Sequence, residues 1–323
     1  MTNSNEFCRQ LGIDVPLICG AMYPCSNPEL VAAASSAGAI GIVQPMSLSY
    51  VHGHDFVEGL DYIGTLTNRP IGVNLLLETS SKTYQERTRR WAEQSAEAGV
   101  KFFITALGNP AWVVKLAEQH GITVFHDVTS IRFAEKALDG GVDGFICVNN
   151  RAGGHAGQLS PEALLEEIGQ LGKPVVCAGG IGSVGRFKEM LDMGYAGAQL
   201  GTRFIATEEC NAHLDYKQAI IQAGEDDIVL TEKISGVPVS IIKTPYIESI
   251  GTKAGPIARW LLKHRKGKHL MRSIYTLQSI YKLKKASVAG SGYKDYWQAG
   301  KSAGDITRIE PVAEIVSRFQ AAL

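Results

Sequence analysis

The chain has 323 residues, of which 45% are hydrophobic and 20% charged, a composition typical of a globular protein with a sizeable core. Lysine plus arginine equals aspartate plus glutamate, at 32 each, so the overall charge does not favour nucleic-acid binding and no nucleic-acid partner is expected. No apolar run approaches the roughly 18 residues of a membrane span, and the first residues lack the pattern of a secretory signal. The sequence therefore predicts a cytoplasmic protein with no transmembrane segment.

The cysteines are scattered and form neither a C-x-x-C pair nor a cluster with histidine. This spacing argues against a zinc site and against a dense disulfide framework, so no metal is expected. Reduced cysteines in apolar runs behave as small hydrophobic residues. The six cysteines are Cys8, Cys19, Cys25, Cys147, Cys177 and Cys210.

Short apolar runs alternate with segments of helical periodicity from residue 16 to about residue 222. The runs predict strands at 17–20, 40–43, 71–76, 102–105, 123–127, 144–148, 174–178 and 197–201. Helices are expected at 27–37, 84–98, 110–119, 130–139, 161–171 and 184–193, the first of them capped by Asn27. Several helices end in a glycine just before the next strand, namely Gly38, Gly99, Gly121 and Gly194. Residues 44–70 are expected to form a long connection.

Strict alternation of strand and helix predicts right-handed βαβ units and a parallel sheet. Eight strands favour a single (β/α)8 TIM barrel, with a doubly wound open sheet as the alternative. We expect residues 1–222 to form the barrel and residues 223–323 to form a C-terminal helical lid and closing segment packed on it. Loops at the carboxyl ends of barrel strands usually build the active site.

Two glycine turns follow the seventh and eighth predicted strands, at Ala178-Gly179-Gly180-Ile181-Gly182 and Gly201-Thr202-Arg203. Glycines let backbone N–H groups approach an anion, and these two loops are the usual phosphate site of barrel enzymes. Ser183 and Arg203 are expected to add a hydroxyl and a guanidinium. The alternative is a pair of tight turns without a ligand.

The loop after the sixth strand is rich in glycine and contains one histidine, in the run Arg151-Ala152-Gly153-Gly154-His155-Ala156-Gly157. This position places the imidazole of His155 at the barrel mouth, where it can accept or donate a proton near neutral pH. The alternative is an exposed loop histidine. His126 ends the fifth strand and is the other histidine near the site, although a packed or solvated side chain is more ordinary there.

Weaker indications come from Gly20-Ala21-Met22 at the end of the first strand and from Asn74 in the third. A small residue followed by methionine suits the face of a flat aromatic ring, and an amide can pair with flavin edge atoms. The chain has neither a G-x-G-x-x-G run after a strand nor a Walker A or G-x-S-x-G pattern, which argues against Rossmann, P-loop and α/β-hydrolase sites.

Taken together, these motifs resemble the nitronate monooxygenase family, formerly called 2-nitropropane dioxygenases. The resemblance extends to Gln199-Leu200-Gly201-Thr202-Arg203-Phe204 and to the tail Tyr296-Trp297-Gln298-Ala299-Gly300-Lys301, and it covers nearly the whole chain. It implies an FMN-containing barrel in which His155 is the catalytic histidine. The implied flavin-binding residues are Ala21, Met22, Asn74, Asp127, Ala152, Gly153, Gly154, Ala178, Gly179, Gly180, Gln199, Gly201 and Thr202.

The resemblance implies oxidation of alkyl nitronates with O2, in some members after the histidine deprotonates the neutral nitroalkane. Flavin-dependent enoyl-acyl-carrier-protein reductases and quinone reductases, which use NAD(P)H, share the scaffold and are the alternative. Two positions depart from the pattern. Arg151 stands where many relatives have glutamate, and Asp127 stands where some have lysine. A carboxylate at Asp127 is expected to disfavour anionic reduced flavin.

A basic stretch occupies residues 253–294. No acidic residue lies between Glu248 and Asp295. The same interval contains eleven basic residues: Lys253, Arg259, Lys263, Arg265, Lys266, Lys268, Arg272, Lys282, Lys284, Lys285 and Lys294. A solvated pair of lid helices is the ordinary interpretation. The alternatives are an acidic partner, an anionic substrate or nicotinamide phosphate, and a membrane-surface helix.

Overall fold

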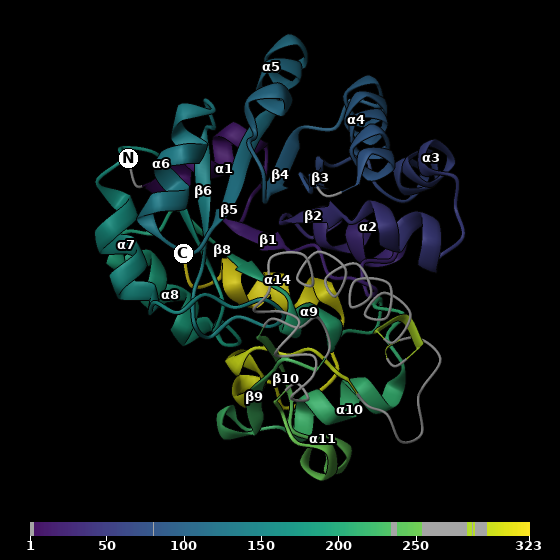
Figure 1. The fold of residues 1–323 in the computed structure, drawn as a ribbon, viewed down its shortest axis with the longest axis vertical. Helices are drawn as coiled ribbons and strands as arrows, with labels where there is room; N and C mark the ends of the chain where they lie inside the picture. Colours follow the sequence, from purple (N-terminus) through teal and green to yellow (C-terminus); the bar gives the residue numbers. More distant parts are fainter. Residues whose placement is uncertain (1–2, 80, 234–237, 254–282, 286, 288–295) are drawn as a thin grey trace.

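The computed structural model describes residues 3–79, 81–233, 238–253, 283–285, 287 and 296–323. Its centre is a closed barrel of parallel strands in the order β1 to β8 (Figure 1). Each strand pairs with the next along the chain, and β1 closes the ring on β8 through Ile18 and Gln199. The strands are β1 (Leu17–Cys19), β2 (Ile40–Val43), β3 (Ile71–Leu76), β4 (Phe102–Ala106), β5 (Thr123–Val128), β6 (Gly144–Val148), β7 (Val175–Ala178) and β8 (Gly197–Leu200). The TIM-barrel prediction is confirmed, and every expected strand is present.

Helices cover the outside of the barrel and alternate with the strands. They are α2 (Pro28–Ser36), α3 (Phe56–Leu66), α4 (Lys82–Glu97), α5 (Ala111–His120), α6 (Ile131–Asp139), α7 (Pro161–Gly169) and α8 (Val184–Met193). The expected glycine stops follow α2, α4, α5 and α8, with φ between +63° and +114°. Glycine reaches this left-handed region without strain.

One local expectation was incomplete and another was wrong. The connection at 44–70 contains a short π-helix (Ser47–Val51) and α3, because an apolar face at Phe56, Leu60 and Ile63 packs into the core. Asn27 precedes α2 but does not cap it. Its amide donates to Glu29 Oε2 at 2.7 Å and to the Glu209 carbonyl at 2.8 Å, which ties the start of α2 to the segment after β8.

Apolar side chains from the strands and from the first helix fill the interior of the barrel. Side chains that alternate along the strands fill the interior, among them Ile18, Ile42, Ile104, Phe125, Ile146 and Val176. Helix α1 (Asn3–Leu11), which lies below the barrel, adds Phe7, whose ring lies 5.6 Å from that of Phe125. The amino-terminal end of the barrel is therefore closed by apolar packing, which leaves the carboxyl end for chemistry.

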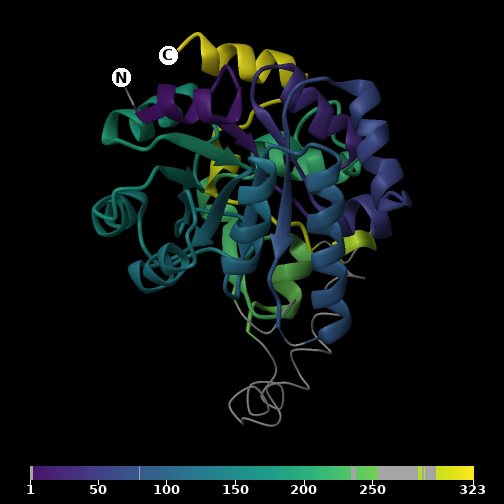
Figure 2. The same cartoon turned by 90° about the horizontal axis from the view of Figure 1, so that it is seen from above.

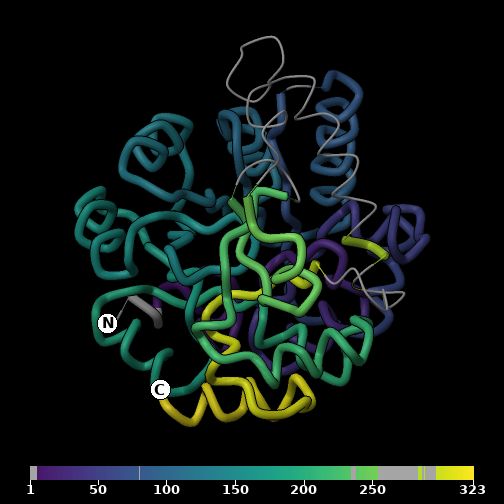
Figure 3. Tube along the Cα trace, turned by 60° about the horizontal axis from the view of Figure 1, so that its bottom comes forward, coloured from purple at the N-terminus to yellow at the C-terminus, as the bar shows by residue number. Residues whose placement is uncertain are grey.

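The chain after β8 folds over the carboxyl end and then returns to the helical ring. It forms α9 (Thr202–Ile205), α10 (Leu214–Gln222), the antiparallel pair β9 (Ile228–Thr231) and β10 (Val239–Ile242), α11 (Pro245–Ile250), a 3-10 helix (Lys301–Asp305) and α14 (Val312–Gln320). In Figure 3 the green segment crosses the barrel, and Gly154 pairs there with Ser240 of β10.

Helix α14 packs against α8 and α2 and so takes the place of the eighth barrel helix. The rings of Phe187 on α8 and Phe319 on α14 lie 5.1 Å apart. This packing puts the two chain ends on the same side of the molecule (Figure 2). The division of the chain at residue 222 stays a prediction, although α14, beyond that point, belongs to the helical ring.

All six cysteines are free, and five of them are buried. Within the described ranges, no helix is long and apolar enough to cross a membrane.

Candidate active site

Four polar side chains face the barrel interior toward the carboxyl ends of their strands. Asp127 lies two residues beyond interior-facing Phe125, and Asn74 lies between Val73 and Leu75, which face the helices. By the same alternation, Gln44 and Gln199 also point inward. We refer to Gln44, Asn74, Asp127 and Gln199 as the polar layer. It covers the apolar barrel core and forms the floor of the mouth.

Two oxygens of this layer are buried and have no hydrogen-bond partner in the described part of the chain: Asp127 Oδ1 and Gln199 Oε1. The other two side chains are bonded, Gln44 accepting from Ser47 N at 2.6 Å and Asn74 donating to the Ile104 carbonyl at 3.4 Å. Buried polar atoms are seldom left unpaired in proteins, because an unmade hydrogen bond costs roughly 1–3 kcal/mol. The layer therefore presents acceptors suited to a polar ligand lying above it.

The Asp127 carboxyl differs from the fixed anion expected from the sequence. Burial raises its pKa to about 7, because the charged form loses its hydration. Near neutral pH a substantial fraction of the molecules carry it uncharged. The expected effect of a permanent negative charge on reduced flavin is therefore weaker than the sequence suggested.

The turn after β7 is a left-handed glycine pair, with φ of 122° at Gly179 and 78° at Gly180. A Cβ at Gly179 would lie 2.5 Å from Asn149 Oδ1, so only glycine lets the turn approach the loop after β6. The Asn149 amide donates to the Gly179 carbonyl at 3.0 Å and holds the two loops together. The turn has the form of an anion-binding cradle.

The turn after β8 opens beside Met22. A Cβ added at Gly201 would lie 3.5 Å from Met22 Sδ, which is ordinary contact. Thr202 is buried, and its hydroxyl accepts from Gly300 N at 3.0 Å. The predicted residues at the ends of β1 and β8 therefore lie side by side, and the tail segment joins them.

The histidine loop is held from two sides. Gly154 N donates to the Ser240 carbonyl at 3.3 Å, and Ser240 N donates to the Gly154 carbonyl at 2.7 Å. A Cβ at Gly153 would lie 2.9 Å from Gly300 N. His155 keeps an exposed face at the mouth, while desolvation by the surrounding atoms lowers the pKa of its imidazole. The ring is therefore neutral near pH 7 and can accept a proton.

Two side chains that the sequence suggested as phosphate contacts are bonded within the protein. Arg203 is buried against Glu310, with Nη1 3.4 Å from Oε2, and its guanidinium also donates to the carbonyls of Ala206 and Arg308. The Ser183 hydroxyl donates to Asp305 Oδ2 at 3.1 Å. Both groups are bonded within the protein, which does not favour the expected phosphate contacts; those contacts stay predictions.

His126 faces away from the barrel interior. Its Nδ1 lies 2.8 Å from Thr105 Oγ1, and burial lowers its pKa to about 4. The packed interpretation of this histidine is therefore correct.

Arg151 lies against the β7 turn rather than over the mouth. A Cβ at Gly180 would lie 2.5 Å from Arg151 Nε, and the guanidinium forms an ion pair with Glu225. The Arg151 carbonyl accepts from Lys301 N at 2.9 Å. This position puts a cation beside the glycine turn, where an anion would bind.

The residues predicted to bind flavin all lie at the carboxyl end of the barrel. Ala21 and Met22 follow β1, Asn74 and Asp127 come from β3 and β5, Ala152, Gly153, Gly154 and His155 come from the loop after β6, and Ala178, Gly179, Gly180, Gln199, Gly201 and Thr202 come from β7, β8 and their turns. Sequence reasoning missed Gln44, although its place directly after the apolar run of β2 could have indicated it. It also missed Gln298, whose Oε1 would lie 3.3 Å from a Cβ at Gly154.

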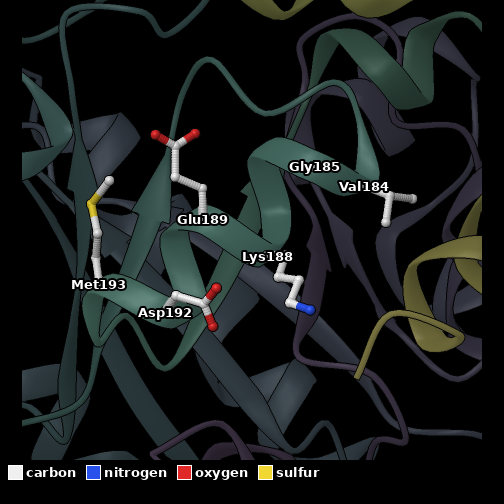
Figure 4. Close-up of a pocket in the computed structure, with 6 residues that line it drawn as sticks. All are labelled: Val184, Gly185, Lys188, Glu189, Asp192 and Met193. Carbon is white, nitrogen blue, oxygen red and sulfur yellow. The ribbon is translucent and has the colours of Figure 1, made fainter.

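This end of the barrel fits a flavin. Among the described residues, two buried oxygens without a partner lie at its floor, a glycine turn with a nearby cation lies at one edge, and the loop after β6 carries an imidazole with a lowered pKa. A hollow on the outer face of α8, lined by Val184, Gly185, Lys188, Glu189, Asp192 and Met193, contains no such set (Figure 4).

The sequence profile described as nitronate monooxygenase matches residues 5–321. The chain belongs to the nitronate monooxygenase family. It is thus a member of a family of flavin-dependent oxidoreductases, as the motifs predicted.

Proteins similar to this chain carry different names. The chain is 25% identical over 241 residues to a (3aS,4S,5R,7aS)-5-hydroxy-7a-methyl-1-oxo-octahydro-1H-indene-4-carboxyl-CoA dehydrogenase of Rhodococcus jostii, which covers 74% of this chain and 66% of the relative. This chain therefore spans slightly less than two thirds of the length of that relative. A probable nitronate monooxygenase of Staphylococcus aureus is 25% identical over 298 residues, covering 80% of this chain and 83% of the relative.

Similar solved structures share the fold along almost the whole chain. FabK from Thermotoga maritima has a TM-score of 0.80 at 24% identity and covers 98% of this chain and 95% of its own. Nitroalkane oxidase from Streptomyces ansochromogenes has a TM-score of 0.76 at 21% identity and covers 96% of both chains. At these identities the likeness supports the architecture alone.

Proposed function

We propose that this chain oxidises alkyl nitronates with O2, with FMN as its cofactor and His155 as its catalytic histidine. The observation that carries the proposal is the position of His155 on a braced loop at the barrel mouth. Gly153 and Gly154 are fixed against Gly300 and Ser240, so the backbone that carries the imidazole has a defined place at the carboxyl end of the barrel. A rigid setting favours catalysis because the reacting groups need no further ordering.

FMN is proposed as the flavin because the site offers one phosphate cradle. The paired turns at Gly179-Gly180 and Gly201-Thr202 suit a single phosphate, and the sequence contains no second nucleotide-binding fingerprint. When bound, the flavin supplies the electron acceptor of the reaction. Purified protein should be yellow and release FMN on denaturation. Release of FAD would contradict the proposal.

The residues of the chain would bind and deprotonate the substrate. With its lowered pKa, the neutral His155 ring can remove the α-proton of a neutral nitroalkane at Nδ1 or Nε2 and hold that proton. The polar layer would hold the flavin edge below, and the Gly154–Ser240 contact would keep the loop closed on that side.

A second candidate is supported by one relative and by the basic stretch. The Rhodococcus jostii relative is named a carboxyl-CoA dehydrogenase, and eleven basic residues without an acid between Glu248 and Asp295 would suit an anionic thioester or NAD(P)H. Most of these residues lie outside the described part of the chain. Of those inside it, Lys284 donates to the Tyr50 carbonyl at 2.8 Å. An acidic partner for this stretch stays a prediction, as does a cytoplasmic location.

Anaerobic mixing distinguishes the two candidates. The oxidised protein is mixed separately with a nitronate, an acyl-CoA thioester, NADH and NADPH while flavin absorbance is followed. Bleaching by the nitronate, with rapid return of the absorbance on admission of O2, supports the proposal. Bleaching by the thioester or nicotinamides, with none by the nitronate, favours the second candidate.

A further inference from the structure

Asp127 is a partly buried acid whose Oδ1 atom is shielded from solvent, and it has no counterion in the described part of the chain. It projects from the carboxyl end of β5 into the barrel, above Phe125, and its Oδ1 has no hydrogen-bond partner. Such an atom calls for an explanation, because a buried carboxylate is costly unless it is paired.

Among the described residues, the groups around Asp127 do not supply a charge that would hold it as an anion. On β6 the Cys147 thiol is near enough to interact electrostatically, but burial raises the pKa of that thiol, so it is neutral. On its own strand, His126 faces the opposite side and is bonded to Thr105. Burial is accordingly the cause of the Asp127 shift, and it raises the pKa to about 7.

We propose that Asp127 contacts the bound flavin as an uncharged carboxyl and thereby makes flavin affinity fall as the pH rises above neutrality. The inference rests on the flavin site proposed above. A protonated carboxyl has one O–H donor and can still accept hydrogen bonds at its oxygens. It can therefore pair with either an acceptor or a donor on the edge of a flat heterocycle. Gln199, whose Oε1 is also buried and unpaired, can bind in a similar way but cannot titrate.

The sign of the pH dependence follows from linkage. A neutral ring placed over the polar layer removes further water from Asp127, which favours the protonated form and raises its pKa in the complex. Flavin therefore binds the protonated protein more tightly than the ionised protein. Above the pKa of the flavin-free protein, affinity should fall by up to about tenfold for each pH unit until the pKa of the complex is reached.

The experiment measures riboflavin binding to the full chain freed of its flavin, by fluorescence quenching between pH 6.5 and 8.5. Riboflavin has no phosphate, so the second ionisation of that group, near pH 6, does not contribute. Burial lowers the pKa of the His155 imidazole, which moves its titration away from this range. Affinity of the wild-type protein should fall at least tenfold across the range.

Asp127→Asn should abolish this slope and bind riboflavin at pH 8.5 about as tightly as the wild type does at pH 6.5. Asp61→Asn, at an exposed position of α3, should keep the wild-type slope. Should Asp127→Asn not fold, the wild-type profile still decides, because affinity independent of pH overturns the inference. Equal slopes in wild type and Asp127→Asn also overturn it, since another group would then be titrating.

Failure of the inference and failure of the proposed function give different results. Binding of FMN and riboflavin with affinity independent of pH removes the role of Asp127 and leaves the flavin site intact. Binding of neither compound at any pH contradicts the proposed function itself.

Discussion

Gly153 and Gly300 pack backbone against backbone, although they are far apart in the sequence. A Cβ on Gly153 would lie 2.9 Å from Gly300 N, and a Cβ on Gly300 would lie 2.7 Å from both Gly153 N and the Arg151 carbonyl. The tail therefore sets the position of the histidine loop. The segment around Gly300 that positions this loop lies about half a chain length further along the sequence.

Gly300→Ala should displace the histidine loop, because the new methyl group meets backbone atoms that cannot rotate away. We expect turnover of the proposed nitroalkane substrate to fall by roughly tenfold or more, since small misplacements of a catalytic group are costly. The measurement is steady-state kinetics together with thermal unfolding. Gly185→Ala is the control: a Cβ there meets nothing within 4 Å, and a helical alanine is slightly stabilising. Unchanged kinetics in Gly300→Ala would mean that the loop is positioned by other contacts.

His155→Asn should separate proton removal from substrate binding. We expect FMN to remain bound, while turnover of neutral nitroalkane falls by roughly 10²–10⁴-fold, the usual range for a general base. Oxidation of the preformed nitronate needs no proton removed from carbon and should fall much less. Equal losses on the two forms would indicate that His155 binds the anion instead.

The pH profile of the wild-type enzyme tests the same base in a different way. Desolvation lowers the pKa of His155 below its ordinary value of 6.5, so the imidazole stays neutral to a lower pH than an ordinary histidine does. The value of kcat/KM for neutral nitroalkane should therefore decline only below about pH 6.5, as the ring becomes protonated. His155→Asn should lack this decline. With FMN kept saturating, a wild-type profile that already declines as the pH is lowered from 8 to 7 would contradict the lowered pKa of the ring.

Arg151→Gln should weaken FMN binding and leave riboflavin binding unchanged. The guanidinium lies against Gly180, so its loss removes a cation from the proposed phosphate cradle. A hydrogen bond to a charged group is worth about 1.5–3 kcal/mol, which corresponds to a loss of roughly tenfold to a hundredfold in FMN affinity. Fluorescence titration with both flavins gives the ratio. Arg186→Gln, which breaks the exposed pair with Glu189 on α8, is the matched control. Equal losses for FMN and riboflavin would make Arg151 a structural residue.

Gly180→Asp is a poorer test of the same cradle. Gly180 has a φ of 78°, and a Cβ there would strike the Arg151 side chain at 2.5 Å. Any loss of FMN would then mix backbone strain with repulsion between the carboxylate and the phosphate.

The strands could be predicted from the sequence because they are buried on both faces and read as continuous apolar runs. The glycine turns could be placed for a related reason, since Gly179 and Gly180 follow such a run directly. The protonation of Asp127 could not be foreseen, because it depends on burial inside the closed barrel and on the absence of a nearby cation in the described structure. The sequence shows only that Asp127 follows His126, which says nothing about the protonation of its carboxyl.

The role of Arg203 shows a second limit of sequence reasoning. Its place after Gly201-Thr202 suggested a phosphate ligand, but its partner is Glu310, more than a hundred residues later. A long side chain can reach in several directions from one backbone position, and the choice is made by tertiary contacts. The helix α3, in contrast, could have been predicted, because Phe56, Leu60 and Ile63 recur at helical spacing after Asp55, which caps the helix.

Glu310→Gln should destabilise the protein strongly at neutral pH, because Glu310 joins the start of α9 to α14. Its carboxylate is buried, accepts from Arg318 Nη1 and Nη2 at 2.6 and 2.7 Å, and lies beside buried Arg203 and exposed Arg308. These arginines lower the pKa of Glu310 to about 2. A carboxyl whose pKa is lowered on folding stabilises the native state above its unfolded pKa, and this contribution is lost as the pH falls from about 4.5 to about 2. The shift corresponds to about 3 kcal/mol at neutral pH.

Urea unfolding should therefore show a loss of about that size for Glu310→Gln at pH 7 and a smaller one at pH 3. Glu189→Gln, which breaks only an exposed pair, should change the unfolding free energy by less than about 0.5 kcal/mol at either pH. A loss for Glu310→Gln that is the same at pH 7 and pH 3 would mean that packing, rather than the charge of Glu310, holds α14 to the barrel.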